Sequence, residues 1–232
     1  MPVEIIKEDP RLISFNTLRK AIGWLGILLP AAIITGNLIF SNCHKVQDSI
    51  SHYYYTVTGN VFVGTLCAVA LFLISYKGYP GDNKDNILTT LAGLFALGIA
   101  FFPTNNNSTD SCAILQLPDN DTRRIVHYVC ATIFFILLAF ISFFFFTKSK
   151  GVKTERKILR NKIYRTCAIV IIVCVLLIAL YGIFGRQLVS LIKYKPIFWL
   201  EWVALLAFGT SWLVKGEMLL KDEPSTDKTV AA

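Results

Sequence analysis

The chain has 232 residues, of which 54% are hydrophobic, and it carries a net charge of +8. The order of the residues excludes a soluble globular protein, because nearly uncharged stretches long enough to cross roughly 30 Å of hydrocarbon as helices recur along the chain. Nucleic-acid binding, which a strongly basic chain would allow, is excluded by the placement of the charge, since the lysines and arginines gather in short segments outside the apolar stretches.

Six apolar stretches indicate transmembrane helices. They are residues 21–40, 57–76, 87–102, 125–146, 163–184 and 196–214. We therefore expect an all-α fold, a polytopic membrane helical bundle with six transmembrane helices. One transmembrane domain, residues 21–215, would be flanked by a cytoplasmic N-terminal segment (residues 1–20) and a cytoplasmic tail (residues 216–232).

The basic segments predict the orientation of the bundle. Seven lysines and arginines lie within residues 148–162 and four more within residues 7–20, and six spans put both segments on the same side. An excess of these residues marks the cytoplasmic face, so both termini are expected in the cytoplasm. The 148–162 loop is also expected to attract anionic lipid headgroups; a plain orientation signal is the alternative.

The loop between the first two spans is unusually polar and aromatic. Residues 48–56, DSISHYYYT, combine an acid, two serines, a histidine and three tyrosines. His44, Asp48 and His52 recur every fourth residue, so a helix would align them on one face. Imidazole and carboxylate groups suit zinc or a similar metal; polar residues at the membrane interface are the alternative. The three tyrosines, residues 53–55, are expected at headgroup level as part of an aromatic belt.

The second and third spans each carry a stripe of small or polar side chains at helical spacing. The stripes are Asn60, Gly64 and Ala68 in the second span and Thr89, Gly93 and Ala96 in the third. Small residues let two helices approach closely, and an asparagine inside a span is costly unless a partner satisfies it. Both stripes are therefore expected to face the interior of the bundle.

Two of the six cysteines fall in the predicted outer loops. Cys43 lies in the first outer loop and Cys112 in the second, residues 104–124. In an oxidising compartment these two could bridge the loops through a disulfide; otherwise they stay reduced. The remaining four cysteines lie within spans and are expected to be small apolar filler.

Ionisable side chains inside the spans are scarce, and each is a functional-site hypothesis by default. Glu201 lies about one and a half turns into the sixth span, and Arg123 and His127 share a face at the start of the fourth. His127 is a candidate ligand or general base, or else a residue at headgroup level. Glu201 is either a site residue or a structural partner of an arginine such as Arg186.

The order of the motifs resembles a known group of membrane proteins. An outer SISHYYYT leads into VFVGTLCAVALFLISYKGY, a span ending in FFPT precedes the histidine of the fourth span, and FWLEWVALLAFGTSWLVKGE follows near the end. This order, over most of residues 40–217, resembles a group of uncharacterised bacterial six-span integral membrane proteins and, more distantly, the superfamily of the Frag, DRAM and Sfk membrane proteins. The resemblance implies a role in membrane-lipid handling, and it favours a bacterial inner membrane over a eukaryotic one.

A second resemblance concerns residue types only. The chain is similar in this respect to the seven-span hydrolases that include alkaline ceramidases, which hold a zinc that activates water against lipid amides. Ser49 or Ser51, together with Asp48, His52 and His127, supplies the same kinds of side chain. The chain departs from that family in having one span fewer and no paired histidines near its C-terminus.

The function expected from the sequence is lipid binding or membrane-lipid organisation by a polar site at the outer leaflet. A metal-dependent lipid hydrolase of the ceramidase-like type and a small transporter are the alternatives. The candidate ligand-binding residues are Ser49, Ser51, His52, Tyr53, Asn60, Arg123, His127 and Glu201. For an enzyme, the candidate catalytic residues are Asp48, His52, His127 and Glu201. The candidate ligands of a zinc ion are His44, Asp48, His52 and His127.

Overall fold

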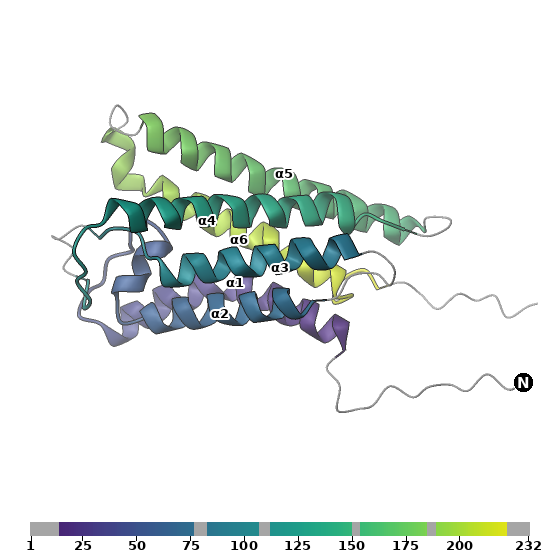
Figure 1. Ribbon diagram of the computed structural model, residues 1–232, viewed down its shortest axis with the longest axis horizontal. Coiled ribbons are helices and arrows are strands. Elements are labelled where there is room, and N and C mark those ends of the chain that lie inside the picture. Colours follow the sequence, from purple (N-terminus) through teal and green to yellow (C-terminus); the bar gives the residue numbers. More distant parts are fainter. Residues whose placement is uncertain (1–13, 77–82, 107–111, 150–153, 185–188, 222–232) are drawn as a thin grey trace, which may run out of the picture.

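The computed structural model describes residues 14–76, 83–106, 112–149, 154–184 and 189–221 (Figure 1). Every regular element in these residues is helical, which confirms the expected all-α fold. The elements are α1 (Phe15–Phe40), the 3₁₀ helix η1 (Ser51–Tyr55), α2 (Gly59–Ser75), α3 (Asn83–Phe101), α4 (Asp121–Phe140), the π-helical turn η2 (Ile141–Phe145), α5 (Glu155–Phe184), the 3₁₀ helix η4 (Val189–Tyr194) and α6 (Pro196–Lys215).

Five of the helices in the described residues are long and apolar enough to cross a membrane, and α2, with 17 residues, is apolar but shorter. Several helices extend beyond the apolar stretches of the sequence. α1 begins at Phe15 because the side chain of Ser14 caps the backbone N–H of Thr17. α4 begins at Asp121 because Asn120 caps the N–H of Arg123 in the same way. Capping side chains therefore set where these two helices begin.

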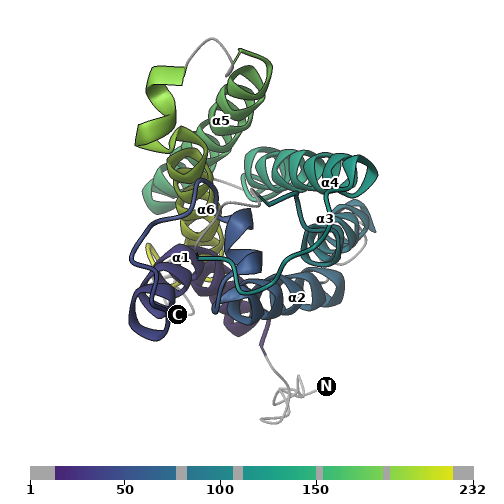
Figure 2. The same cartoon turned by 90° about the vertical axis from the view of Figure 1, so that its left-hand side faces the viewer.

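The helices form a ring in chain order. Each α-helix packs against its neighbour in the sequence, and α6 closes the ring by packing along α1. Figure 1 shows the helices running alongside one another along the long axis of the molecule, and Figure 2 shows η1 inside the ring at one end. We call this end, with residues 41–58, 102–106 and 112–120, the η1 end.

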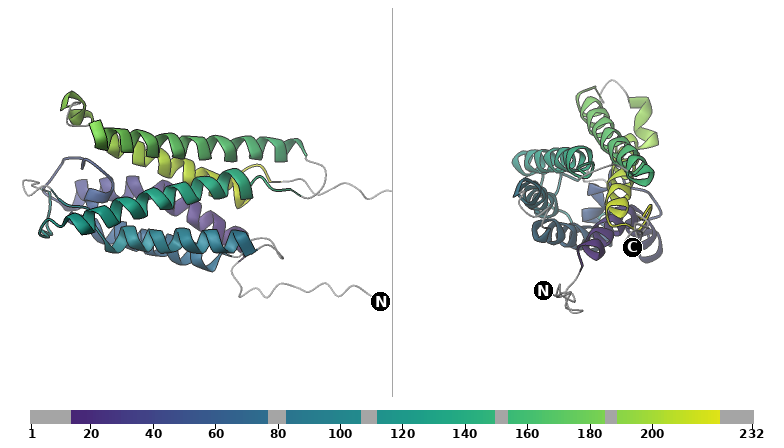
Figure 3. Two further views of the ribbon diagram at one scale, coloured as in Figure 1. Left: turned by 45° about the horizontal axis from the view of Figure 1, so that its top comes forward. Right: turned by 90° about the vertical axis from the view of Figure 1, so that its right-hand side faces the viewer.

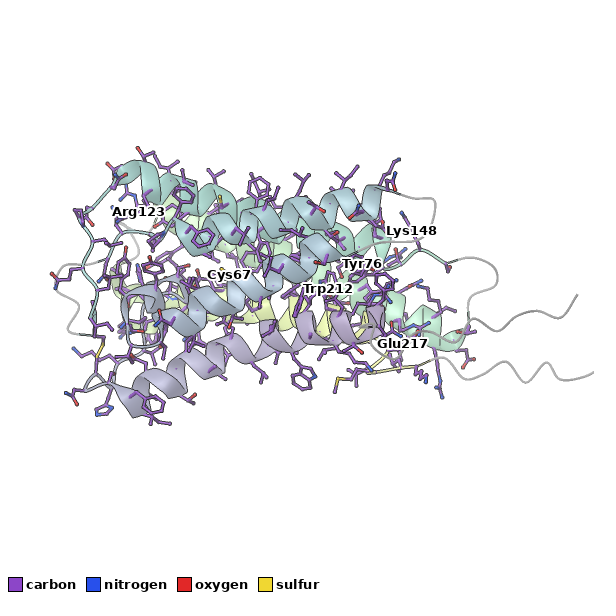
Figure 4. All side chains as sticks on the ribbon, turned by 60° about the horizontal axis from the view of Figure 1, so that its bottom comes forward. Cys67, Tyr76, Arg123, Lys148, Trp212 and Glu217 are labelled. Atoms are coloured by element: carbon purple, nitrogen blue, oxygen red, sulfur yellow. A yellow bond between two sulfur atoms is a disulfide. The ribbon has the colours of Figure 1, made fainter. Side chains whose placement is uncertain are left out.

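The opposite end of the ring is closed by aromatic and charged side chains. The start of α1 lies beside the end of α6 there (Figure 3, right). Trp212 packs edge-on against Tyr76, with ring centroids 5.4 Å apart. Lys148 and Asp85 form an ion pair of 3.4 Å. Figure 4 shows Tyr76, Lys148 and Trp212 toward this end of the bundle and Arg123 at the η1 end.

Close packing between α1 and α6 depends on two glycines. A Cβ atom on Gly209 would lie 2.5 Å from the carbonyl oxygen of Gly23, and a Cβ atom on Gly23 would lie 2.8 Å from the carbonyl oxygen of Gly209. A side chain at either position would therefore push the two backbones apart, as in other helix pairs that meet through small residues.

The two small-residue stripes have opposite outcomes. The stripe of α3 is buried, and a Cβ atom on Gly93 would lie 2.7 Å from the carbonyl oxygen of Ala70, which confirms that this face packs against α2. The expectation for the second span is wrong, because Asn60 and Gly64 are exposed and nothing lies within 4 Å of a Cβ on Gly64. α2 instead turns larger apolar side chains such as Leu66 inward, where they fill the interior of the ring.

Apolar side chains cover the outside of the ring as well as its inside. On α5, Ile169, Leu176 and Ile183 are 56%, 57% and 71% exposed, and α5 is the least buried of the five long apolar helices. Soluble monomers rarely expose contiguous apolar surface on this scale. A surface of this kind is suited to contact with lipid chains.

The contact between Gly209 and Gly23 leads to a stability prediction. Gly209→Ala should lower the free energy of unfolding by about 1–3 kcal/mol, because the new methyl group overpacks a backbone contact. Gly182→Ala is the matched control, since a Cβ there meets nothing within 4 Å. The control should be neutral or stabilising by up to about 1 kcal/mol through helix propensity. Thermal unfolding in detergent measures both, and equal midpoints for the two variants would contradict the close contact.

Candidate functional site

The first long loop enters the end of the helical ring. Residues 41–50 have no regular structure, and η1 begins only at Ser51. His44, Asp48 and His52 therefore do not share a helix face, and the expectation based on their spacing is wrong. His44 is exposed beside the loop disulfide, whereas His52 is partly buried near the ring interior.

The tyrosines of η1 are core residues of this end. Tyr53 and Tyr55 are 1% and 0% exposed, so the expected aromatic belt is wrong for these two. The Tyr53 hydroxyl accepts a hydrogen bond from the backbone N–H of Gln47 (3.4 Å), and the Tyr55 hydroxyl donates one to the carbonyl of Thr104. Burial raises the pKa of the Tyr53 hydroxyl above its ordinary value, so this side chain stays a neutral phenol. The two rings attach η1 to the surrounding loops.

A disulfide fastens the first loop to the second. Cys43 and Cys112 are bonded, with their Cα atoms 5.2 Å apart and a separation of 69 positions in the chain. Shortly after Cys112, the backbone N–H groups of Ile114 and Leu115 donate to the carbonyl of Tyr55 (2.8 and 3.2 Å). The second loop thus runs along η1 and covers it from outside the ring.

Glu201 fastens the same segment to α6. Its Oε2 atom accepts a hydrogen bond of 2.5 Å from the backbone N–H of Ile50, the residue just before η1. Lys195, the residue just before α6, forms an ion pair of 3.5 Å with Asp48. The partner of Glu201 is thus a backbone donor of the loop. Arg186, which the sequence suggested as its partner, lies outside the described residues.

His127 connects η1 to α4 and to the end of α3. The imidazole is 2% exposed. Its Nδ1 atom lies 2.8 Å from the carbonyl oxygen of Phe102, and its Nε2 atom lies 3.0 Å from the Oγ of Ser51. A carbonyl oxygen only accepts hydrogen bonds, so Nδ1 carries the proton and Nε2 accepts from the serine hydroxyl.

A cavity of about 670 Å³ lies beside η1, between α4, α5 and the start of α6. The η1 segment, His127 and Glu201 line its polar end, and residues such as Phe135 and Ile178 form its apolar walls. Ala179 and Gly182 of α5 also line it and are exposed, so the cavity opens toward the outside of the ring. Its volume falls in the range of small-molecule sites.

A second, almost wholly apolar cavity of about 350 Å³ follows further along the α4–α5 seam. Ile136, Phe140 and Phe143 line it from α4 and η2, and Ile169 and Val173 line it from α5. The two helices contact each other less extensively than α5 contacts α6. The second cavity thus lies in the same seam as the first, farther from the polar groups of the η1 end.

Six of the residues singled out from the sequence meet at the first cavity. They are Asp48, Ser49, Ser51, His52, His127 and Glu201. Tyr53 is not among its lining residues, because its ring packs into the core against Phe198. Asn60 lies on the outside of α2. Arg123 binds the loop backbone instead, donating to the carbonyls of Pro103 (3.1 Å) and Pro118 (3.0 Å).

The expected metal ligands do not form a cluster. His44 lies at a separate cavity beside the disulfide, away from Asp48, His52 and His127. Across the described ranges, no three His, Cys, Asp or Glu side chains are grouped so that they could hold a metal ion. The residues present therefore do not fit the zinc site that the ceramidase-like resemblance implied.

Other lining residues were missed by the sequence reasoning. Thr104, Arg124 and Thr132 add polar groups to the first cavity, and Gly182 leaves space at its edge. Arg124 follows Arg123 directly, and only the rotation of α4 decides which of the two faces the cavity. The one feature of the sequence that pointed to Arg124 was its place along the chain, because it lies, like His127, in the first two turns of α4.

The hydrogen bond between Glu201 and Ile50 predicts a local change in backbone protection. Glu201→Ala should free the Ile50 amide and accelerate hydrogen exchange in residues 48–56 by roughly fivefold to a hundredfold, because a buried backbone donor that loses its acceptor costs about 1–3 kcal/mol. Glu201→Gln keeps an acceptor oxygen and should show a smaller change. Exchange mass spectrometry on the detergent-solubilised protein measures both, and an unchanged rate in Glu201→Ala would show that the bond does not hold the loop.

Comparison with known proteins adds no relative from which a function can be transferred. No protein-family model matches the chain, and no curated protein or solved structure matches it. A function for this chain is therefore inferred from the contacts within the chain itself.

Proposed function

We propose that this protein binds a membrane lipid or a similar amphiphile in the cavity beside η1 and takes part in membrane-lipid organisation. The observation that supports this most directly is the division of the cavity lining. One end carries carboxylate, hydroxyl and imidazole groups, and the α4 and α5 walls are apolar. A ligand that satisfies both parts has a polar head and a hydrocarbon chain.

The α4–α5 seam suits the chains of such a ligand. With its head beside Ser51, His127 and Glu201, an acyl chain would pass the apolar walls of the first cavity toward the second one. The opening between the two helices faces the outside of the ring, where the surrounding lipid would be. A membrane lipid could thus enter sideways, without passing through water.

The proposal includes a topology with six transmembrane helices and both termini in the cytoplasm. α2 would be the shortest span, which a bundle accommodates by local thinning of the bilayer. The η1 end would then face the exterior, and the disulfide between Cys43 and Cys112 is compatible with an oxidising compartment there. A bacterial inner membrane, and kinship with the six-span bacterial proteins that the motifs resemble, belong to the same proposal.

The proposal also includes binding of anionic headgroups at residues 148–162, but with fewer of the basic side chains of this segment available for it. Lys157 donates to the carbonyl of Phe146 (3.1 Å), Arg160 donates to that of Leu220 (3.0 Å), and Lys148 pairs with Asp85. These charges already have protein partners. The orientation signal is therefore the stronger interpretation of this basic segment.

The two alternatives from the sequence rank below lipid binding. A metal-dependent hydrolase requires a ligand cluster, which the described residues do not form. A small transporter requires a polar path from one end to the other, but the described interior between the η1 end and the opposite end, where Trp212 packs against Tyr76, consists of packed apolar side chains.

Filling the cavity should weaken lipid binding. The probe is a phospholipid with a photoreactive diazirine in one acyl chain, incorporated with the purified protein into lipid nanodiscs. In the native protein it should crosslink to α4 and α5 peptides that line the cavities. Gly182→Phe should reduce these crosslinks at least tenfold, because the ring enters space that is empty of protein atoms.

Gly64→Phe is the matched control for this substitution. It places the same side chain on another helical glycine with nothing within 4 Å, on the outside of α2. Its crosslinks at α4 and α5 should equal those of the native protein. Ala131→Phe narrows the cavity from the opposite wall. Unchanged crosslinking in both Gly182→Phe and Ala131→Phe would refute the proposed site.

The proposed orientation is tested by labelling cysteines in intact cells. Cys43 and Cys112 should react with a membrane-impermeant maleimide only after an impermeant reductant has opened their disulfide. A cysteine introduced in the basic loop by Thr154→Cys should react only after the cells are opened. The reverse pattern would place the η1 end in the cytoplasm and contradict the proposed topology.

A further inference from the structure

We propose that Ser51 and His127 form a nucleophile–base pair that transfers an acyl group from an ester-containing membrane amphiphile. This inference rests on the amphiphile cavity proposed above and adds a reaction to it. It assigns the chemistry to a metal-free pair, whereas the sequence alone suggested a zinc site.

His127 is positioned to activate the hydroxyl group of Ser51. Its Nε2 atom lies 3.0 Å from the Oγ of Ser51, within reach for direct proton transfer. Its Nδ1–H is held by the carbonyl of Phe102 at 2.8 Å, which fixes the tautomer and the plane of the ring. A nucleophile bonded to a base, with the base oriented by a third group, is the arrangement that covalent catalysis uses.

The pair is held on rigid supports. Ser51 is the first residue of η1, directly after Ile50, whose N–H is bound by Glu201. His127 lies in the second turn of α4 and is almost completely buried. The serine and the histidine come from segments 76 residues apart in the chain, so their contact depends on the closed ring.

The position of the pair in the cavity suits an ester. Both residues line the first cavity, where its polar end meets the apolar walls of α4 and α5. In a glycerolipid, the ester carbonyls lie at the corresponding junction, between the polar head and the hydrocarbon chains. A lipid bound as proposed above would therefore bring a carbonyl carbon toward the Oγ of Ser51.

The reaction proceeds in two steps that balance. The Oγ of Ser51 attacks the ester carbonyl, and His127 Nε2 takes the hydroxyl proton. The tetrahedral intermediate expels the alcohol, to which the imidazolium returns that proton, and an acyl-serine remains. Water or an acceptor alcohol then attacks the acyl-serine and gives its proton to Nε2, and this proton passes to Oγ as Ser51 is released. Arg124 lines the same cavity, with its guanidinium paired to the Asp121 carboxylate at 2.8 Å.

The group that orients His127 is the backbone carbonyl of Phe102, whereas a catalytic triad has a carboxylate in this place. A neutral carbonyl orients the imidazole but stabilises the imidazolium less than a carboxylate does. A slow enzyme or a slow acyltransferase is therefore expected. The first step, acylation of Ser51, is the one that the geometry supports most directly.

An alkyl fluorophosphonate tests the first step, because it phosphonylates an activated serine and releases fluoride. The full-length protein in nanodiscs is treated with a long-chain fluorophosphonate, and the adduct is located by peptide mass spectrometry. We expect one adduct, on Ser51, that is absent in Ser51→Ala. His127→Gln should lower the labelling rate at least a hundredfold through the loss of the general base. Thr35→Ala, on the exposed face of α1, should label like the native protein.

A second variant covers the case in which His127→Gln fails to fold. In Ser51→Cys the histidine is unaltered, and a thiol beside an imidazole acceptor ionises more readily than an isolated one. Its alkylation by iodoacetamide should be at least tenfold faster than that of the thiol introduced by Asn60→Cys, which lies on the exposed face of α2. Equal alkylation rates at the two positions would refute the pairing.

The crosslinking lipid, applied to the same samples, separates the two proposals. Crosslinks in the cavity without an adduct on Ser51 would overturn the acyl-transfer inference and leave lipid binding intact. The absence of both would overturn lipid binding, and the inference with it. An adduct on Ser51 that forms equally fast in folded His127→Gln would show that the histidine is a structural contact and not a base.

Discussion

A loop that enters an apolar helical ring must find partners inside the protein for its backbone N–H and C=O groups. This constraint shapes the η1 end. Glu201 accepts from the N–H of Ile50, the hydroxyl of Ser49 accepts from the N–H of His52, and the hydroxyl of Thr56 donates to the carbonyl of Tyr53. The dense run of polar residues in the first loop is therefore needed to bury the loop, before any function is considered. The candidate site is built on this scaffold.

The helices of the ring pack closely on one side and less closely on the other. Gly23 and Gly209 bring the backbones of α1 and α6 into direct contact. Across the ring, α4 and α5 contact each other less extensively, and both cavities lie in that seam, lined by bulky side chains such as Phe135 and Phe140. In the proposed binding site, the polar groups at the head of the seam are held by α6, α4 and the first loop through contacts within the chain.

The type of a residue and its position within an apolar stretch were good guides to which groups meet at the cavity. The rotation of each helix about its own axis could not be predicted in this way. Glu201 and His127 stand out because ionisable groups in apolar helices need partners, and the structure places both against the η1 segment. The same reasoning failed for Asn60 and Arg123. Asparagine at the very start of α2 reaches the exposed surface, and the guanidinium of Arg123 is used by the carbonyls of the second loop.

The sequence by itself determined the helical architecture, because long uncharged stretches in this order can satisfy their backbones in an apolar environment only as helices. It also determined which few side chains would be chemically unusual. Only the tertiary structure decided which helix faces point inward, since lipid and protein interior are both apolar and periodicity cannot distinguish them. The hydrogen bond between Ser51 and His127 is likewise a property of the closed ring, because it joins residues whose spacing in the chain carries no information about their contact.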